Sequence, residues 1–326
     1  DTDNDGICDA QEAIDETNPN DACDPNNTDT DNDGICDNQE IIDGTDPNDG
    51  CDPNVNSIGC TPEIKVFPRV FLQGAFEEAD GMMRDDLRTS NVIPMQNPYA
   101  EMPVFNHTGL EIIADDSVLD NAASVSDNIV DWVLVELRDA QDPAQVIATR
   151  AALVQRDGDV VDTDGVSAVS FPVFAGGYYL AVRHRNHLGA MTNEAVNLSA
   201  VPGEVFDFTD ADLETYGNYA RKVAGEEDEL RVLWGGNAIA DNQLIFQGAN
   251  NDVDAIFFNI LAATDNSNTD QNFINQGYYQ ADTNMDGRAI FQGNKNDIDF
   301  LIFFNVLTHY SNVTILVNYI IEEQLP

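Results

Sequence analysis

The middle of the chain contains short runs of hydrophobic residues, whereas the N-terminal fifth is largely polar. The runs are rich in Val, Ile, Phe and Tyr and are separated by clusters of Asp, Gly, Asn and Pro. Within 129–138, Val130, Trp132 and Leu134 point one way and the intervening residues the other, as the period of a strand requires. These runs predict an antiparallel β-sandwich over residues 63–225. The candidate strands are 64–73, 103–114, 129–138, 145–155, 166–174, 178–186 and 195–208.

The C-terminal part contains a tandem duplication with an offset of 45 residues. The matching segments are 244–254 and 256–261 in the first copy, and 289–299 and 302–307 in the second. Each copy resembles a dockerin repeat, which implies a loop followed by a short helix, at 252–261 in the first copy and at 297–309 in the second. Helices this short are marginal alone, so we expect their apolar faces to pack on each other in a small α module over residues 226–326.

The N-terminal segment is also repeated, because residues 1–26 recur at 29–54 with a period of 28. In both units acidic residues alternate before a Gly and a Glu closes the loop at its twelfth position. Such side chains converge on one point, where Ca²⁺ finds its ~6–8 oxygen ligands and Mg²⁺ fits poorly; a solvated acidic linker is the alternative. The predicted ligands are Asp1, Asp3, Asp5, the Ile7 carbonyl, Asp9 and Glu12, and then Asp29, Asp31, Asp33, the Ile35 carbonyl, Asp37 and Glu40.

The second C-terminal copy contains the start of a further calcium loop. The first copy has Asn237, Ile239 and Asp241 at the matching positions, and an Ile side chain cannot coordinate a metal ion. We therefore expect one sound site and one degraded site. The predicted ligands of the sound site are Asp282, Asn284, Asp286 and the Arg288 carbonyl, with Asp297 or Asp299 to close it.

The charge of the chain is strongly negative, with 59 Asp plus Glu against 14 Lys plus Arg and a net charge of −45. This field repels phosphate backbones and anionic lipids, so no nucleic acid partner is expected. No apolar run reaches the ~18–20 residues of a membrane span, so no membrane insertion is expected. Residues 1–60 hold 15 Asp and 3 Glu without a Lys or Arg, and we expect them to stay disordered unless a cation compensates their repulsion.

All five cysteines lie in the polyanionic segment, which indicates an oxidising compartment and an extracellular or cell-surface protein. Two pairings are open. Bridges within units would be Cys8–Cys23 and Cys36–Cys51, whereas bridges across units would be Cys23–Cys36 and Cys51–Cys60. We favour the second pairing, because each of its bridges ties neighbouring units together.

The sandwich region offers little chemistry. His184 and His187 are three apart, and on a continuous strand such side chains point to opposite faces, so a structural role is favoured over metal binding. The segment 156–165 contains four Asp residues that could hold a cation, but its Asp-Gly pairs favour hairpin turns. The sequence has no nucleophile elbow, phosphate loop or zinc spacing. We therefore expect no enzyme activity.

The two N-terminal units resemble thrombospondin type 3 repeats, since no amphipathic helix precedes either loop as it would in an EF-hand. This resemblance covers residues 1–62 and implies a calcium-wrapped, disulfide-pinned rod. Each C-terminal copy resembles a dockerin repeat, although the spacing after Gly287 is longer. The expected fold is thus mostly β, with a calcium-bound repeat rod, an antiparallel β-sandwich and a small C-terminal EF-hand/dockerin-like α module.

The segments PRVFLQGAF, MRDDLRTSNVIP, VDWVLVELRD, LAVRHRNHLGAMT and IFQGNKND are similar to domains of large secreted proteins of Bacteroidota. The similarity runs from about residue 65 to the end and implies export, often by the type IX route. Glycosylation is also expected. The matching patterns are 116–118 for the short O-glycosylation motif of that phylum, and N-x-Ser/Thr sequons at Asn26, Asn106, Asn197 and Asn312.

Three functions fit these features. The first is an extracellular structural protein, a calcium-stabilised subunit that self-associates into a bacterial surface filament or stalk. The second is an adhesion module in which the sandwich binds a glycan or a surface protein. The third is an ancillary region of a larger secreted enzyme. We favour the first, because a rod, a sandwich and a compact module in series suit a filament.

Overall fold

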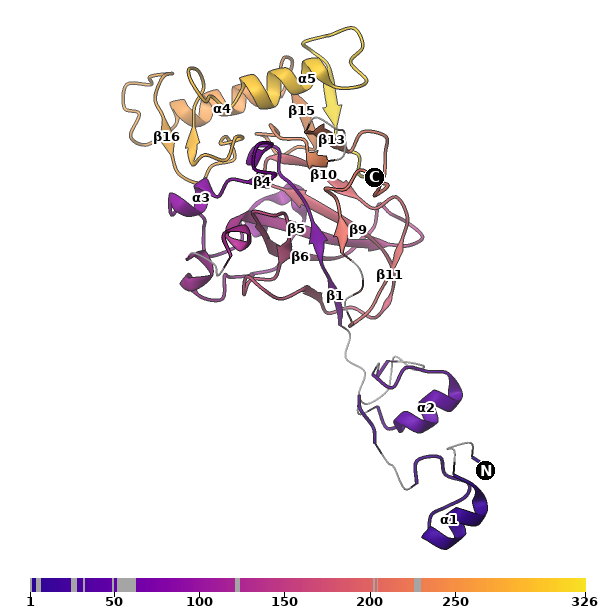
Figure 1. Cartoon of the computed structure of the whole chain (residues 1–326). Helices are drawn as coiled ribbons and strands as arrows, with labels where there is room; N and C mark the ends of the chain where they lie inside the picture. The colour runs from indigo at the N-terminus through magenta and orange to yellow at the C-terminus, as the bar shows by residue number, and fades with distance from the viewer. Residues whose placement is uncertain are drawn as a thin grey trace. The chain divides into compact units, whose positions relative to one another are not determined.

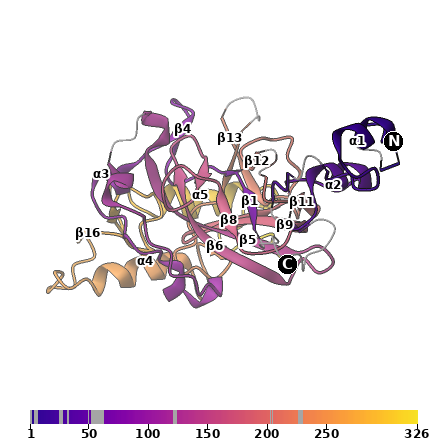
Figure 2. The same ribbon diagram turned by 90° about the horizontal axis from the view of Figure 1, so that it is seen from below.

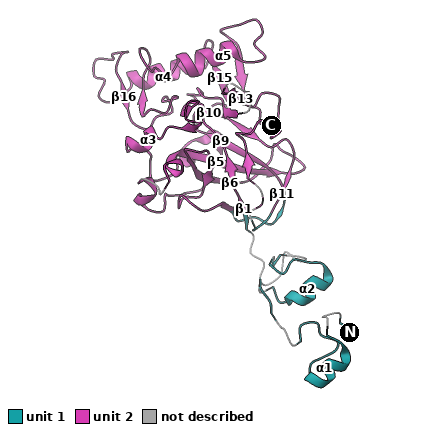
Figure 3. Cartoon of the chain, in the orientation of Figure 1, with its two compact units in different colours: residues 1–64, 171–176, 199–201 teal, residues 65–170, 177–198, 202–326 magenta. Residues whose placement is uncertain are grey.

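The structure is a computed structural model that describes residues 2–3, 7–24, 28–31, 33–48, 50–51, 63–120, 124–201, 203, 205–225 and 230–326. The chain divides into two compact units (Figure 3). Unit 1 comprises residues 1–64, 171–176 and 199–201, and unit 2 comprises residues 65–170, 177–198 and 202–326. The three domain limits expected above stay predictions.

Unit 1 contains one short helix in each repeat (Figure 1). Helix α1 spans Asp9–Asp15 and helix α2 spans Asp37–Asp43. Each helix ends at a residue in the left-handed conformation, Glu16 with φ 61° and Gly44 with φ 79°, which terminates it after about two turns. Helices of this length are not stable alone, so other interactions must hold them in place.

The Cys23–Cys36 disulfide joins the segment after α1 to the start of α2, with 5.8 Å between the two Cα atoms. This is the favoured pairing across units, and the pairing within units is wrong. Cys8 is exposed and belongs to no disulfide among the described residues. The second favoured bridge, Cys51–Cys60, ends at a residue outside the described ones.

Unit 2 is built on a six-stranded antiparallel sheet with the order β10-β9-β5-β6-β7, in which β11 also pairs with β9. All but the last residue of β5 are buried, so both faces of the sheet are covered along this strand. Figure 2 shows this sheet from below. Its strands are β5 (Ile129–Asp139), β6 (Val146–Gln155), β7 (Val160–Val161), β9 (Gly176–His184), β10 (His187–Met191) and β11 (Val196–Leu198).

Small two-stranded sheets and single helical turns make up most of the remaining regular structure. Among the described residues, strands hold 27% and helices 17%, which confirms the mostly β class. The further strands are β1 (Ile64–Val66), β2 (Pro68–Arg69), β3 (Phe76–Glu77), β4 (Met82–Met83), β8 (Val169–Phe171), β12 (Phe206–Asp207), β13 (Arg221–Ala224) and β14 (Leu230–Leu233). The helical turns are α3 (Asp86–Thr89), η1 (Tyr99–Glu101), η2 (Pro103–Phe105), η3 (Asp116–Leu119) and η4 (Val125–Asp127).

One expected strand is wrong. The range 103–114 begins with the 3₁₀ turn η2 and contains only an isolated bridge, between Ile112 and Gln96. Pro103 at the first position of the turn favours helical rather than extended backbone there. Its side chains Phe105 and Ile113 are nevertheless buried, so the hydrophobic pattern reported burial correctly but not strand geometry.

The predicted helix at 252–261 is confirmed as α4 (Asp252–Leu261), which starts where the Asn251 side chain accepts a hydrogen bond from the Asp254 backbone N–H. The second predicted helix forms η5 (Asp299–Phe303), a π-helical turn, followed by α5 (Phe304–Thr308). Both helices bury their apolar sides in one core, which also includes Leu188 and Trp234 from the strand region. The helical module therefore shares its core with the sheet region.

The two C-terminal copies exchange strands with each other. Strand β15 (Gln243–Ile245) of the first copy pairs with β18 (Ile320–Glu322) of the second. Reciprocally, β17 (Arg288–Ala289) of the second copy pairs with β16 (Asn275–Gln276) of the first. The module is therefore one intertwined unit with approximate two-fold symmetry, and neither copy is complete without the other.

Candidate calcium sites

The acidic residues of the second repeat form a cage. Asp29, Asp31 and Asp33 each accept a backbone hydrogen bond with one carboxylate oxygen, from Gly34 N at 3.1 Å, Asp33 N at 3.1 Å and Ile35 N at 2.7 Å respectively. These bonds fix the orientation of the three side chains. One ligand oxygen from each of the three lies within 4.8 Å of the other two.

The remaining oxygens of the cage are buried, and among the described residues they have no hydrogen-bond partner. They are Asp29 Oδ1, Asp31 Oδ2, Asp33 Oδ2 and both carboxylate oxygens of Glu40. Glu40 is 0% exposed, and its burial, together with the charges of Asp31 and Asp33, raises its pKa to about 7. Burying so many unpaired carboxylate oxygens is unfavourable unless a cation joins them. Hard oxygen donors closed by a Glu that can bind through both oxygens fit Ca²⁺.

Two further predicted ligands lie in the same loop. Asp37 accepts hydrogen bonds from Thr30 N at 2.8 Å and Thr30 Oγ1 at 2.7 Å, so both of its oxygens are already engaged. In EF-hand loops the ligand at this position often acts through a water molecule, which suits such an orientation. Ile35 is partly buried and would contribute its carbonyl oxygen.

The first repeat has the same arrangement as far as it is described. Thr2 Oγ1 donates to Asp9 Oδ2 at 2.8 Å, which reproduces the Thr30–Asp37 contact one period earlier. Glu12 is 0% exposed, as is Glu40. Asp3 and Ile7 are also described, whereas the predicted ligands Asp1 and Asp5 lie outside the described residues.

The C-terminal loop brings together the acidic residues that sequence reasoning selected. Asp282 and Asp297 are both 0% exposed. Asp282 accepts the backbone N–H groups of Asp286 at 3.0 Å and Gly287 at 2.8 Å, and Asp297 accepts that of Asn284 at 3.1 Å. Burial raises the pKa of Asp282 to about 7 against the opposing charge of Arg185, and burial together with the charge of Asp282 raises the pKa of Asp297 well above its ordinary value. A bound divalent cation would offset the free-energy cost of burying these two carboxylates in their charged form. Their oxygens, however, already accept hydrogen bonds from backbone N–H groups.

Two other residues of this loop are less suited to coordination. The Arg288 guanidinium pairs with Asp286 at 2.6 Å and so already neutralises part of its charge. Asp299, the alternative closing ligand, is exposed and accepts a hydrogen bond from Asn296 Nδ2 at 2.9 Å. The C-terminal loop is therefore less suited to bind a cation than the loop of the second N-terminal repeat.

The first C-terminal copy lacks a complete set of metal ligands but keeps the hydrogen bonds of the second copy. Asp252 accepts the backbone N–H groups of Ile239 at 3.1 Å and Ile245 at 2.8 Å, and Asp297 receives the equivalent pair 45 residues later. Burial raises the pKa of Asp252 to about 7. Asp252 thus connects the loop to the start of α4 through these two hydrogen bonds. Because the folded chain buries its carboxylate, the charged form of Asp252 opposes folding.

A pH dependence follows from Asp252. Its pKa in the folded chain is above the ordinary value of 3.8, so its contribution to stability is greatest below pH 4 and is lost as the pH rises to about 7. The contribution changes by at most ~1.4 kcal/mol per pH unit. In saturating calcium, the Asp252→Asn variant should show a shallower fall in the free energy of unfolding between pH 5 and pH 7 than the wild type, measured by urea titration. Equal slopes would contradict this role.

The C-terminal loop is held by residues that sequence reasoning did not select. Asn186 Nδ2 donates to the Asp282 carbonyl at 2.7 Å, and Arg84 Nη2 donates to the Asn284 carbonyl at 2.7 Å. A Cβ atom added at Gly74 would lie 2.2 Å from the Thr283 carbonyl oxygen, so only glycine allows this approach. These residues lie far from the loop in sequence, and no local signal identifies them.

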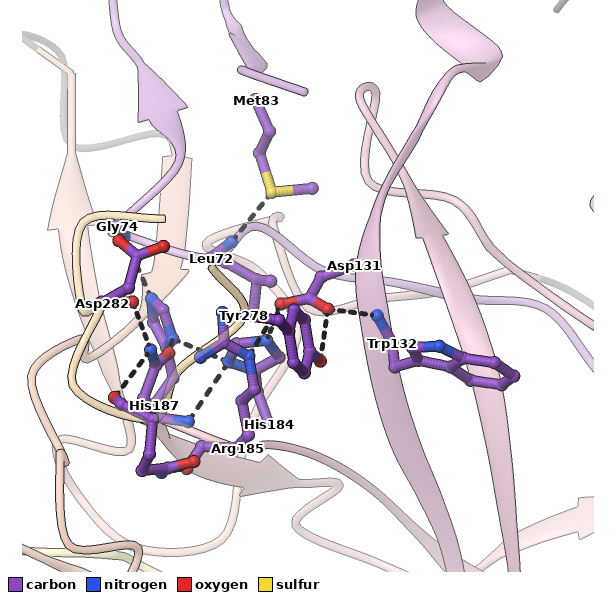
Figure 4. A network of polar contacts seen from close by, with 12 residues as sticks. Leu72, Gly74, Met83, Asp131, Trp132, His184, Arg185, His187, Tyr278 and Asp282 are labelled. Carbon is purple, nitrogen blue, oxygen red and sulfur yellow. Dashed lines mark hydrogen bonds and ion pairs between the residues drawn. The ribbon is translucent and has the colours of Figure 1, made fainter. Parts of the chain in front are cut away.

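The two histidines lie beside this contact in a buried network (Figure 4). The expectation that they point to opposite faces is wrong, because a two-residue turn between β9 and β10 pairs His184 with His187 across the hairpin. His187 Nε2 accepts the Gly74 N–H, the two Nδ1 atoms are 2.9 Å apart, and His184 Nε2 donates to Asp131 at 3.1 Å. All four ring nitrogens are engaged, so neither histidine is available to a metal ion.

Comparison with known proteins identifies the N-terminal part alone. Residues 1–22 and 29–50 match a family model described as the bacterial TSP3 repeat. No curated protein and no solved structure matches the chain. The match covers both predicted loops, including the one that forms the cage of Asp29, Asp31 and Asp33, and repeats of this family are of a calcium-binding type. The N-terminal segment is therefore similar to a calcium-binding extracellular structural region.

Proposed function

We propose that this protein is an extracellular structural subunit of a bacterial surface filament or stalk, in which calcium stiffens the N-terminal repeats. The observation that carries the proposal is the buried carboxylate of Glu40, which faces the Asp29, Asp31 and Asp33 cage with no hydrogen-bond partner among the described residues. Calcium supplies the missing charge and joins ligands from both ends of the loop. A polyanionic segment thereby becomes a rigid spacer.

Other features agree with a structural role. In the part of the chain that the structure describes, no helix is long and apolar enough to cross a membrane. The Cys23–Cys36 disulfide links the two repeats and suits an oxidising exterior. We propose no catalytic function, and the partner that we propose for the protein is a further copy of itself.

Limited proteolysis of the full chain tests the calcium part of this proposal. With excess calcium, residues 7–51 should resist cleavage about as well as unit 2. After chelation, cleavage within 7–51 should come first, because the carboxylates then repel each other. A digestion pattern that does not change with chelator would contradict the calcium-stiffened spacer.

Electron microscopy of the native material tests the filament part, and dispersed monomers at every calcium concentration would contradict it.

A further inference from the structure

The second C-terminal copy carries an exposed apolar loop at residues 313–317. Its side chains are unusually open to solvent for hydrophobic residues: Val313 is 85% exposed, Ile315 68%, Leu316 50% and Val317 38%. The flanking stretch, from His309 to Ile321, contains no Asp, Glu, Lys or Arg, in a chain of net charge −45. Contiguous exposed apolar surface of this kind marks an interaction site more often than a structural need.

The equivalent loop of the first copy shows that the fold does not require these side chains. Asn266 Nδ2 donates to the Ile260 and Asp270 carbonyls at 2.9 Å each, and Asn312 Nδ2 donates to the Val306 and Leu316 carbonyls 46 residues later. The two loops therefore share one scaffold. The first copy nevertheless reads Ser-Asn-Thr-Asp-Gln at 267–271, where the second reads Val-Thr-Ile-Leu-Val.

The backbone of the apolar loop is also poorly suited to its residues. Ile315 has φ 54°, and Thr269 at the equivalent position has φ 50°. A β-branched residue in this left-handed region is strained in both copies, so what sets Ile315 apart from Thr269 is the exposure of a wholly apolar side chain to solvent. An apolar residue in such a position is best explained by a partner that covers it.

The same module offers an apolar groove of about 610 Å³. It lies at the approximate two-fold axis, because its lining includes two equivalent pairs, Phe246 with Phe291 and Val253 with Ile298. Phe303 completes the apolar lining and packs on Phe246 with 4.8 Å between ring centroids. Asp299 is the one charged residue among the groove's lining residues, and the apolar loop of the same chain is not part of that lining.

We propose that the apolar loop of one chain binds in the phenylalanine-lined groove of a second copy of the chain. Both surfaces are apolar and nearly uncharged, so this is where two strongly negative molecules can approach with least repulsion. The loop and the groove are different surfaces, so the contact is head-to-tail and can continue into an open chain of subunits. The inference rests on the proposed function and names the contact between subunits.

The loop sequence of the first copy provides the substitutions that test the proposed contact. A loop-swap variant carries Val313→Ser, Ile315→Thr, Leu316→Asp and Val317→Gln, the residues of the first copy. Sedimentation velocity of the full chain in calcium should show association that grows with concentration for the wild type and a monomer for the loop-swap variant. The melting temperature should not fall, because the first copy forms the same loop with these residues. A matched control, Leu110→Ser with Val166→Ser, removes exposed apolar side chains elsewhere and should associate like the wild type.

A mixing experiment tests the head-to-tail geometry. Gln292→Trp changes an exposed residue at the groove, so its indole should fill the groove without disturbing the core. This variant and the loop-swap variant should each be monomeric alone, and an equimolar mixture should form dimers and nothing larger. Association of the loop-swap variant at the wild-type level, or a mixture that stays monomeric, would overturn the proposal. So would a wild type that is monomeric but binds phosphatidylcholine vesicles through the loop.

The two proposals can fail separately. Association that the loop-swap variant retains at the wild-type level, with calcium-dependent protease resistance intact, would reject the loop-and-groove contact alone. An unchanged digestion pattern after chelation, with loop-dependent association intact, would reject the calcium-stiffened spacer and leave the contact standing.

Discussion

Replacing Glu40 with glutamine is expected to lower the calcium affinity of the second repeat by roughly two to three orders of magnitude. Glu40 is fully buried and faces the buried Asp33 and the partly exposed Asp29 and Asp31, so calcium in this cage would be held by charges that water screens less than on the open surface. Removing one member of a buried charge pair costs about 3–5 kcal/mol, and each ~1.4 kcal/mol is a factor of ten in affinity. Calorimetric titration of the calcium-free full chain would measure the loss.

The same helix provides a matched control for Glu40. Asp43 is exposed and accepts a hydrogen bond from Gln39 at 3.0 Å, outside the predicted ligand positions. Asp43→Asn removes the same charge from α2 and should leave the affinity within about a factor of three, because exposed charges contribute ~0–1 kcal/mol. Equal losses in both variants would show that the net charge of the segment, and not the cage, binds calcium.

The cage of the second repeat could be anticipated because it lies within twelve consecutive residues. The spacing of Asp29, Asp31, Asp33 and Glu40 alone brings these side chains together once the chain coils. The disulfide between Cys23 and Cys36 was favoured because it ties neighbouring units together, and the structure contains it. What the spacing did not indicate is that the last residues of each loop begin a short helix, α1 or α2.

Helix α4 was predicted with its exact limits, because its start and end depend on neighbouring residues. Asn251 caps its first turn, and the periodic Ile256 and Ile260 supply its buried side. In contrast, 103–114 was assigned to a strand on its hydrophobic content alone. Burial without a local signal for backbone geometry is compatible with many conformations.

The contacts that hold the C-terminal loop could not be anticipated from the sequence. Asn186 and Asp282 are 96 positions apart, and their hydrogen bond depends on how the hairpin of β9 and β10 meets the duplicated module. The pairing of His184 with His187 depends on a turn of only two residues, which a reading of one continuous strand excluded. The same turn places Arg185 next to Asp131.

Asp131→Asn is expected to lower the free energy of unfolding by about 3–5 kcal/mol, because it leaves the charge of Arg185 buried without compensation. Asp131 is 0% exposed and accepts hydrogen bonds from Arg185 Nε at 3.0 Å and from the Tyr278 hydroxyl at 2.7 Å. Burial alone would raise the pKa of Asp131, but the charge of Arg185 and the hydrogen bonds with His184 and Tyr278 together outweigh it, and the pKa is lowered. Both groups are therefore ionised in the folded chain.

Urea titration of the full chain in calcium measures this loss, with Asp212→Asn as an exposed control that should change stability by less than about 0.5 kcal/mol. The double variant Asp131→Asn with Arg185→Met separates the charge pair from the rest of the network. It should cost less than the sum of the two single changes, because no charge is then left alone in the interior. Strict additivity would mean that Arg185 is compensated by other groups, and that the sheet and the C-terminal loop are joined by hydrogen bonds to the backbone rather than by this ion pair.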